Sequence, residues 1–263
     1  MRKNVKQQLA LRVLSTAALM AMVSSIATAA FAAEYNVKDG SVEIVAKDGV
    51  QSITQWADKD EGTYVTDDKG AIKDREDSNI ILTTKNKDTG ETETTSNTVT
   101  ITAENKGDTA NVTLKDVDIE TESSWNNSGS APIEIKGNGN TNLELNGDNT
   151  VLSGDRHHAA IEKADKNGHG TLTIKDDLND DNSTPKDKDE NGNAAGGDTG
   201  KLLAGGYGDG AGIGGGFKDT TDLSYANTSN ITIKGGEITA RGGYEDGAGI
   251  GGAGAANDAQ VKI

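Results

Sequence analysis

Two copies of one glycine-rich segment decide the architecture: residues 205–216 read GGYGDGAGIGGG and residues 242–253 read GGYEDGAGIGGA. A repeat of this length with one short apolar motif per copy is typical of a solenoid, in which each repeat contacts only its neighbours. The sequence therefore predicts stacked coils, and not a globular domain with a single centre.

The apolar centre of this repeat also occurs upstream. A small residue, any residue and an isoleucine form the same element at four places: Ala131-Pro-Ile133, Ala159-Ala-Ile161, Ala211-Gly-Ile213 and Ala248-Gly-Ile250. Residues two apart share one face of a strand, so the alanine and the isoleucine should both point inward. The flanking glycines are then expected to form corners where neighbouring coils approach closely.

Short alternating apolar runs between these elements predict further strands. They are Val99–Ile101, Val112–Leu114, Val117–Ile119, Ile133–Ile135, Leu143–Leu145, Leu172–Ile174, Ile231–Ile233 and Ile238–Ala240. Two strands around a glycine bend recur at residues 231–240 and, more distantly, at 143–151, which places Leu143 opposite Ile231 and Val151 opposite Ala240.

A unit of two or three short strands with a turn at each corner is what one coil of a parallel β-helix needs. We therefore expect an all-β chain with a parallel β-helix over residues 99–263, and fold precedent gives a right-handed one. Residues 177–198, rich in Asp, Asn, Lys and Gly, are expected to be a polar insertion in one loop. In residues 33–98, charged runs separate the strand-like segments, and this part is expected to form an N-terminal β cap. Because the sequence stops within an expected strand at Ile263, we expect a fragment of a longer protein.

Residues 1–32 have the pattern of a cleaved secretory signal peptide. Basic residues precede an apolar stretch at residues 13–27, and Ala30-Phe31-Ala32 supplies small residues for cleavage. No later stretch is apolar enough for a membrane span. The sequence therefore predicts an exported protein, either secreted or held at the cell surface, with no transmembrane segment after the signal peptide.

Composition limits the partners. The chain has a formal net charge of −16 and no cysteine, and four of its positive charges lie in residues 1–32. Such a surface repels nucleic acid and anionic lipid, so nucleic-acid binding is not expected. Aromatic residues make up only 3% of the chain. A solenoid tolerates this, because each coil buries only a narrow apolar strip.

The repeated GAGIGGG pattern, tied to strands such as Ile-Thr-Ile-Lys-Gly-Gly, resembles secreted β-helical surface proteins of Gram-positive gut bacteria. Residues 112–119, 131–133 and 142–149 are also similar to clostridial carbohydrate-binding β-helix domains. Together the resemblances cover roughly residues 99–263. They imply a surface protein that binds a glycan such as a cell-wall polysaccharide, with calcium as an additional ligand, and no catalysis. Their motifs are structural, so they carry over no binding residues.

Tyr207 and Tyr244 occupy equivalent positions in the two glycine-rich copies. If the copies stack, the two rings lie on one face, where they would offer a sugar ring an apolar platform. The competing interpretation is a tyrosine ladder that only stabilises the corner.

The polar insertion carries carboxylates of the type that calcium prefers, and Asp176, Asp177, Asp180 and Asp181 are the candidate ligands. The spacing of an ordered calcium loop is missing, and lysines interrupt the run. A solvated loop is the competing interpretation.

The segment Asp155-Arg156-His157-His158 is the candidate for catalysis. A basic residue there would remove a proton from a sugar acid, as in a polysaccharide lyase. The acidic surface suits such a substrate poorly. We therefore expect a carbohydrate-binding adhesion module that is not an enzyme; the alternatives are a polysaccharide lyase or glycoside hydrolase, and a passive stalk.

Overall fold

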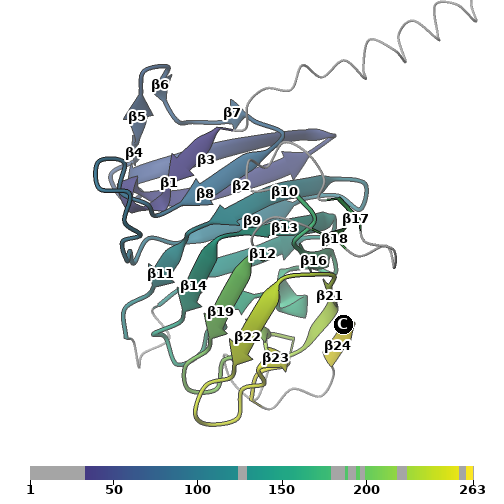
Figure 1. Cartoon of the computed structure of the whole chain (residues 1–263). Helices are drawn as coiled ribbons and strands as arrows, with labels where there is room; N and C mark the ends of the chain where they lie inside the picture. Colours follow the sequence, from purple (N-terminus) through teal and green to yellow (C-terminus); the bar gives the residue numbers. More distant parts are fainter. Residues whose placement is uncertain are drawn as a thin grey trace, which may run out of the picture. The chain divides into compact units, whose positions relative to one another are not determined.

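The computed structural model describes residues 33–123, 129–178, 187–188, 194–195, 199–217, 224–254 and 259–262, and the predicted signal peptide lies outside these ranges. The described residues are almost all strands and turns, and the strands gather into three large sheets (Figure 1). Helix is limited there to two short 3-10 turns, η1 (Val37–Asp39) and η2 (Asp165–Asn167). None of the described segments forms a helix long and apolar enough to cross a membrane. The predicted all-β class is confirmed.

Two of the large sheets are entirely parallel. Sheet 1 has the strand order β1 (Glu34–Asn36), β8 (Ile80–Thr83), β10 (Thr109–Lys115), β13 (Asn140–Asn146), β16 (Thr171–Lys175), β21 (Thr228–Ile233) and β24 (Ala259–Lys262). Sheet 2 has the order β11 (Asp118–Glu120), β14 (Asp148–Leu152), β19 (Lys201–Gly205) and β22 (Glu237–Arg241).

Sheet 3 is parallel along most of its width. Its order is β23 (Ile250–Gly251), β20 (Ile213–Gly214), β15 (Ile161–Glu162), β12 (Ile133–Gly137), β9 (Val99–Ala103), β2 (Ser41–Lys47), β3 (Val50–Asp58) and β4 (Thr63–Tyr64), with β7 (Arg75–Glu76) also beside β3. Two small antiparallel pairs complete the described strands: β5 (Thr66–Asp67) with β6 (Gly70–Ala71), and β17 (Asp187–Lys188) with β18 (Ala194–Ala195).

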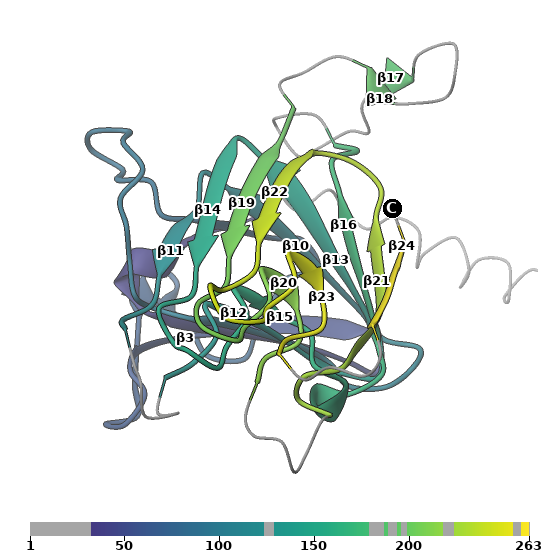
Figure 2. The same ribbon diagram turned by 90° about the horizontal axis from the view of Figure 1, so that it is seen from below.

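From β9 onward the chain visits the three sheets in a fixed order, sheet 3, then sheet 1, then sheet 2. We call each such set of three strands a round. Every round adds its strands beside those of the round before, so that β12, β13 and β14 lie next to β9, β10 and β11. Figure 2 shows the strands of the three sheets along three sides of the stack. All the strands that the sequence predicts from residue 99 onward are present.

Isoleucines in sheet 3 form a column that runs through the rounds. Ile133 pairs with Ile161, Ile161 with Ile213 and Ile213 with Ile250. The first three are fully buried, and Ile250 is half-buried against the same core. The alignment of the four small-residue elements is therefore confirmed by the strand pairing.

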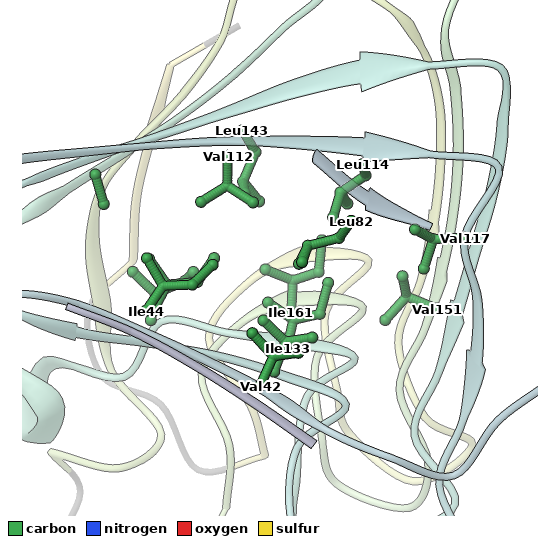
Figure 3. Packing of buried hydrophobic residues seen from close by; sticks show 14 of the residues in the cluster. Val42, Ile44, Leu82, Val112, Leu114, Val117, Ile133, Leu143, Val151 and Ile161 are labelled. Carbon is green, nitrogen blue, oxygen red and sulfur yellow. The ribbon is translucent and has the colours of Figure 1, made fainter. Parts of the chain in front are cut away.

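The core lies between the inner faces of the sheets. Figure 3 shows Ile133 and Ile161 from sheet 3 below Leu143 and Leu114 from sheet 1, with Val151 from sheet 2 at the side. Complete burial of one such side chain stabilises the fold by about 1.5–3 kcal/mol. A narrow strip of Ile, Leu and Val per round thus suffices although aromatic residues are scarce.

One predicted register is wrong by two residues. Leu143 pairs with Ile174, which pairs with Ile233, whereas Ile231 lies in the column of Leu172 and Thr141. The second strand of the same unit has the predicted register, because Val151, Ala204 and Ala240 form one column. Both possible registers of Leu143 place its side chain inward, since side chains alternate with a period of two.

The N-terminal strands join the same sheets. Strand β2 pairs in parallel with β9, and β3 returns antiparallel to β2 through a turn at Asp48 and Gly49, which both have positive φ. Such a turn is typical of a two-residue β-hairpin. The parallel pairing of sheet 3 therefore ends at β2, and β3 borders it.

Candidate functional site

The loops that lead from sheet 2 to sheet 3 bring the candidate residues together. We call residues 153–160, 206–212 and 242–249 the corner loops; they follow β14, β19 and β22 in three consecutive rounds. Backbone hydrogen bonds join them, because Asp209 N–H donates to the Arg156 carbonyl, and Glu245 N–H donates to the Gly208 carbonyl. The loops therefore stack upon one another as the strands do.

Glycines allow this close stacking. A Cβ atom on Gly210 would lie 2.2 Å from the His158 carbonyl oxygen, and one on Gly247 would lie 2.1 Å from the Gly210 carbonyl oxygen. Gly208 also has a φ of +56°, which favours glycine. The glycines of the repeat thus occupy points of close approach between rounds.

Tyr207 and Tyr244 lie side by side on the corner loops. Their ring centroids are 5.1 Å apart and the ring planes meet at 78°, an edge-to-face pair. Tyr244 is 59% exposed and Tyr207 is half-buried. The pair presents one open aromatic ring, that of Tyr244, on the stacked corner loops.

Arg156 links the same loops through charge. Its Nη2 donates to Glu245 Oε2 at 2.5 Å, and its Nε lies 3.6 Å from Asp209 Oδ2. The hydrogen bond from Arg156 is the main reason that the pKa of Glu245 is lowered. Burial and the neighbouring Glu245 raise the pKa of Asp209, although Arg156 opposes this. One guanidinium thus faces two carboxylates on the loops that carry the two tyrosines.

Asp155, within the segment considered for catalysis, stabilises the turn of its own loop. The Asp155 side chain is fully buried and accepts backbone hydrogen bonds from His157 at 2.9 Å and from Gly129 at 3.1 Å. The ring of His157 stacks on Phe217, with centroids 5.5 Å apart. These contacts give Asp155 and His157 a structural role in the loop.

His158 forms a pair with Glu162. The distance from His158 Nδ1 to Glu162 Oε2 is 2.7 Å. Burial disfavours the imidazolium, but the hydrogen bond and charge of Glu162, helped by Asp155, outweigh it and raise the pKa of His158. Glu162 is almost fully buried, so this pair is directed into the protein.

The described carboxylates of the predicted calcium site point to different partners. Asp176 Oδ2 accepts from Gly200 N at 3.3 Å, across the two ends of the polar insertion, and Asp177 Oδ1 pairs with Lys175 at 2.6 Å. Asp180 and Asp181 lie outside the described residues. Over the ranges that the structure describes, no group of three or more His, Asp or Glu side chains is placed to hold a metal ion.

A hollow of about 420 Å³ opens near the loop between β11 and β12, one round before the first corner loop. It is lined mainly by hydroxyl side chains, those of Ser96, Thr98, Thr121, Ser123 and Ser130. Gly154 N–H donates to the hydroxyl of Thr121, which connects this hollow to the corner loops. The surface on this side therefore combines hydroxyls, one ion-pair cluster and one aromatic pair.

The sequence interpretation named Tyr207 and Tyr244 but missed the acidic partners of Arg156. One signal was available: the two copies differ at only two positions, and at one of them Glu245 replaces Gly208. Since Gly208 has no side chain, the Glu245 carboxylate reaches past it to Arg156, two rounds earlier.

Comparison of the chain with protein-family models, with curated proteins and with solved structures gives no match.

Proposed function

We propose that this chain is a secreted or cell-surface parallel β-helix that binds carbohydrate and does not catalyse a reaction. The main support for this proposal is the Tyr207–Tyr244 pair on the stacked corner loops. An exposed aromatic ring offers the apolar face of a sugar a flat contact, and adjacent polar groups supply hydrogen bonds.

The β-helix proposal rests on the repeated order of the sheets. A chain that visits three parallel sheets in turn, with each strand beside its counterpart from the previous round, has the connectivity of a solenoid. The handedness proposed here, right-handed, is the one that parallel crossovers almost always adopt.

The charges beside the tyrosines favour a neutral glycan. Arg156 is engaged by Glu245 and Asp209, so the cluster offers no free cation for an acidic sugar. The negative charge of the whole chain adds repulsion of a polyanion. A wall or surface polysaccharide with uncharged sugars therefore fits the corner loops best.

Binding also fits these residues better than hydrolysis. The carboxyls of Asp209 and Glu245 both contact the guanidinium of Arg156, whereas glycoside hydrolysis needs two carboxyls roughly 5 Å or more apart, with the sugar between them. The carboxylate of Asp155, next to Arg156, accepts hydrogen bonds from the backbone N–H groups of Gly129 and His157.

A glycan array probed with the purified chain, with and without a calcium chelator, tests the proposal. We expect binding to neutral glycans that is weakened in Tyr244→Ala and kept in Tyr225→Ala, because Tyr225 lies outside the corner loops, beside Lys166. An absence of binding under both conditions would favour a passive stalk. Release of unsaturated or reducing sugar from the bound glycans would favour a lyase or a hydrolase instead.

A further inference from the structure

A second hollow lies on the outer face of sheet 1, away from the corner loops that join sheets 2 and 3. Its volume is about 340 Å³, near the lower end of the range for small-molecule sites. Its walls include side chains of three adjacent strands: Asn111 and Thr113 on β10, Asn142 and Glu144 on β13, and Lys175 on β16.

Strand alternation explains why these polar side chains face outward. On β13, Leu143 and Leu145 are buried in the core, so Asn142 and Glu144 lie on the opposite face. The pairing then sets the neighbours: Asn142 lies beside Asn111, and Glu144 lies between Thr113 and Lys175. The hollow thus has a defined row of polar groups.

The two asparagines form a fixed amide pair. Asn142 Nδ2 donates to Asn111 Oδ1 at 2.9 Å. Gln51 holds the backbone of Asn111 on both sides, since its Oε1 accepts from Asn111 N at 2.6 Å and its Nε2 donates to Asn111 O at 3.1 Å. In the described part of the chain, Asn142 Oδ1 and Asn111 Nδ2 have no hydrogen-bond partner. One acceptor and one donor therefore remain free beside the hollow.

Glu144 forms the floor. Only 3% of this residue is exposed, and its Oε1 accepts from the backbone N–H groups of Asp177 at 2.9 Å and Leu178 at 2.8 Å. Oε2 lies 3.3 Å from Lys175 Nζ, yet it makes no hydrogen bond to any described residue. A buried acceptor without a hydrogen bond is uncommon, and here the ammonium of Lys175 faces it.

The charges in this hollow are balanced. Lys175 is shared by the carboxylates of Glu144 and Asp177. Burial raises the pKa of Glu144 to about 7, although the Leu178 N–H and the charge of Lys175 oppose this. Two carboxylates thus surround the single cation, which leaves no unpaired positive charge for an anionic ligand and suits a neutral ligand that offers hydroxyl groups.

We propose that this hollow is a second binding site, for a neutral, hydroxyl-rich ligand the size of one sugar ring. The free atoms of Asn111 and Asn142 bind two hydroxyls, next to the ion pair of Glu144 with Lys175. Among the described residues no aromatic ring lines the hollow, so we expect a dissociation constant on the order of millimolar. The site is independent of the tyrosine pair, and either site can fail alone.

Titration of the ¹⁵N-labelled chain with methyl glycosides of glucose, galactose and N-acetylglucosamine tests this proposal. The side-chain amide signals of Asn111 and Asn142 should shift and saturate with at least one of the three. Asn142→Ala should weaken this binding by about tenfold, because two hydrogen bonds are lost. One joins Asn142 Oδ1 to the ligand, and the other joins Asn142 Nδ2 to the amide of Asn111. Asn111→Ala is the second variant if Asn142→Ala does not fold.

Asn140→Ala is the matched control. Asn140 lies two residues earlier on the same face of β13, where it joins Thr109 and Thr171 outside the hollow. Its replacement should leave the affinity unchanged. Unshifted amide signals with all three glycosides would overturn the proposal, as would equal affinity of the wild type and Asn142→Ala. Loss of the amide shifts in Tyr244→Ala would also overturn it, by moving the ligand to the corner loops.

Discussion

The ring of Tyr244 packs edge to face against the ring of Tyr207, 37 residues earlier in the chain, with 5.1 Å between centroids. The two residues occupy the same place in consecutive copies of the glycine-rich repeat. Their contact depends on the stacking of the corner loops, in which Gly243 N–H donates to the Gly210 carbonyl at 2.9 Å. A local repeat in the sequence thus produces a surface feature that no single repeat contains.

Removal of the Tyr244 ring should weaken glycan binding. We expect Tyr244→Ala to lower the affinity roughly three- to tenfold, which is the usual contribution of one aromatic contact, and Tyr244→Phe to retain most of it. Isothermal titration with a glycan found on the array measures both. Equal affinities of wild type and Tyr244→Ala would exclude this ring from the site.

Truncation of the isoleucine column should destabilise the stack. Ile133 is fully buried between Val99 and Ile161, so Ile133→Ala should lower the free energy of unfolding by about 2–5 kcal/mol. Val50, on β3, is 48% exposed, and Val50→Ala should change the stability by no more than about 0.5 kcal/mol. Urea unfolding followed by circular dichroism compares the two. Similar stability of both variants would contradict the packing described here.

A side chain at Gly210 should push two rounds apart. Its Cβ would meet the His158 carbonyl oxygen at 2.2 Å, and a backbone atom cannot move aside as a flexible side chain can. We expect Gly210→Ala to cost about 1–3 kcal/mol of stability. Gly107→Ala is the control, because no atom lies within 4 Å of a Cβ there. Thermal unfolding distinguishes the variants, and a stable Gly210→Ala protein would disprove the close approach.

Glu144 should make the stability depend on pH. Burial raises its pKa from 4.5 to about 7, against the Leu178 N–H and the charge of Lys175, so the folded chain holds this proton more tightly than the unfolded chain. The resulting stabilisation is fully present below about pH 4.5 and is lost as the pH rises through 7.

Glu144→Gln removes this titration. The variant and the wild type should have similar free energies of unfolding at pH 5, whereas at pH 8 the variant should be more stable, by at most about 3 kcal/mol. Urea unfolding across this pH range measures the difference. A difference that does not change with pH would show that Glu144 keeps an ordinary pKa in the folded chain.

The strands and their order could be predicted from the sequence because inward and outward residues alternate visibly. Each predicted run of Val, Ile and Leu from residue 99 onward is a strand, and the four small-residue elements pair as aligned. The register of Leu143 was wrong by two residues, because a shift of two keeps every apolar side chain inward and leaves no trace in the pattern.

The candidate site could be predicted only in part. Equivalent repeat positions place Tyr207 near Tyr244, and their contact follows from stacking alone. The contact of Arg156 with Glu245 spans 89 positions and depends on the way in which three loops superimpose. Likewise, only the fold shows that Asp176 turns toward Gly200 at the far end of the polar insertion.

The burial of Lys163 could not be predicted from its residue type either. Its charge predicts an exposed residue, yet it is 1% exposed and its Nζ donates to the Gly168 carbonyl at 3.0 Å. It follows the inward Ile161 by two positions, so alternation gives it an inward place despite its charge. Burial lowers the pKa of Lys163 in consequence.

Binding of a neutral glycan at the tyrosine pair is the central claim, and NMR of the tyrosine rings tests it most directly. Titration of the ring-labelled chain with a glycan found on the array should shift the ring signals of Tyr207 and Tyr244 and leave those of Tyr35 unchanged, because Tyr35 is buried. Unperturbed Tyr207 and Tyr244 signals in the presence of a bound glycan would contradict the account.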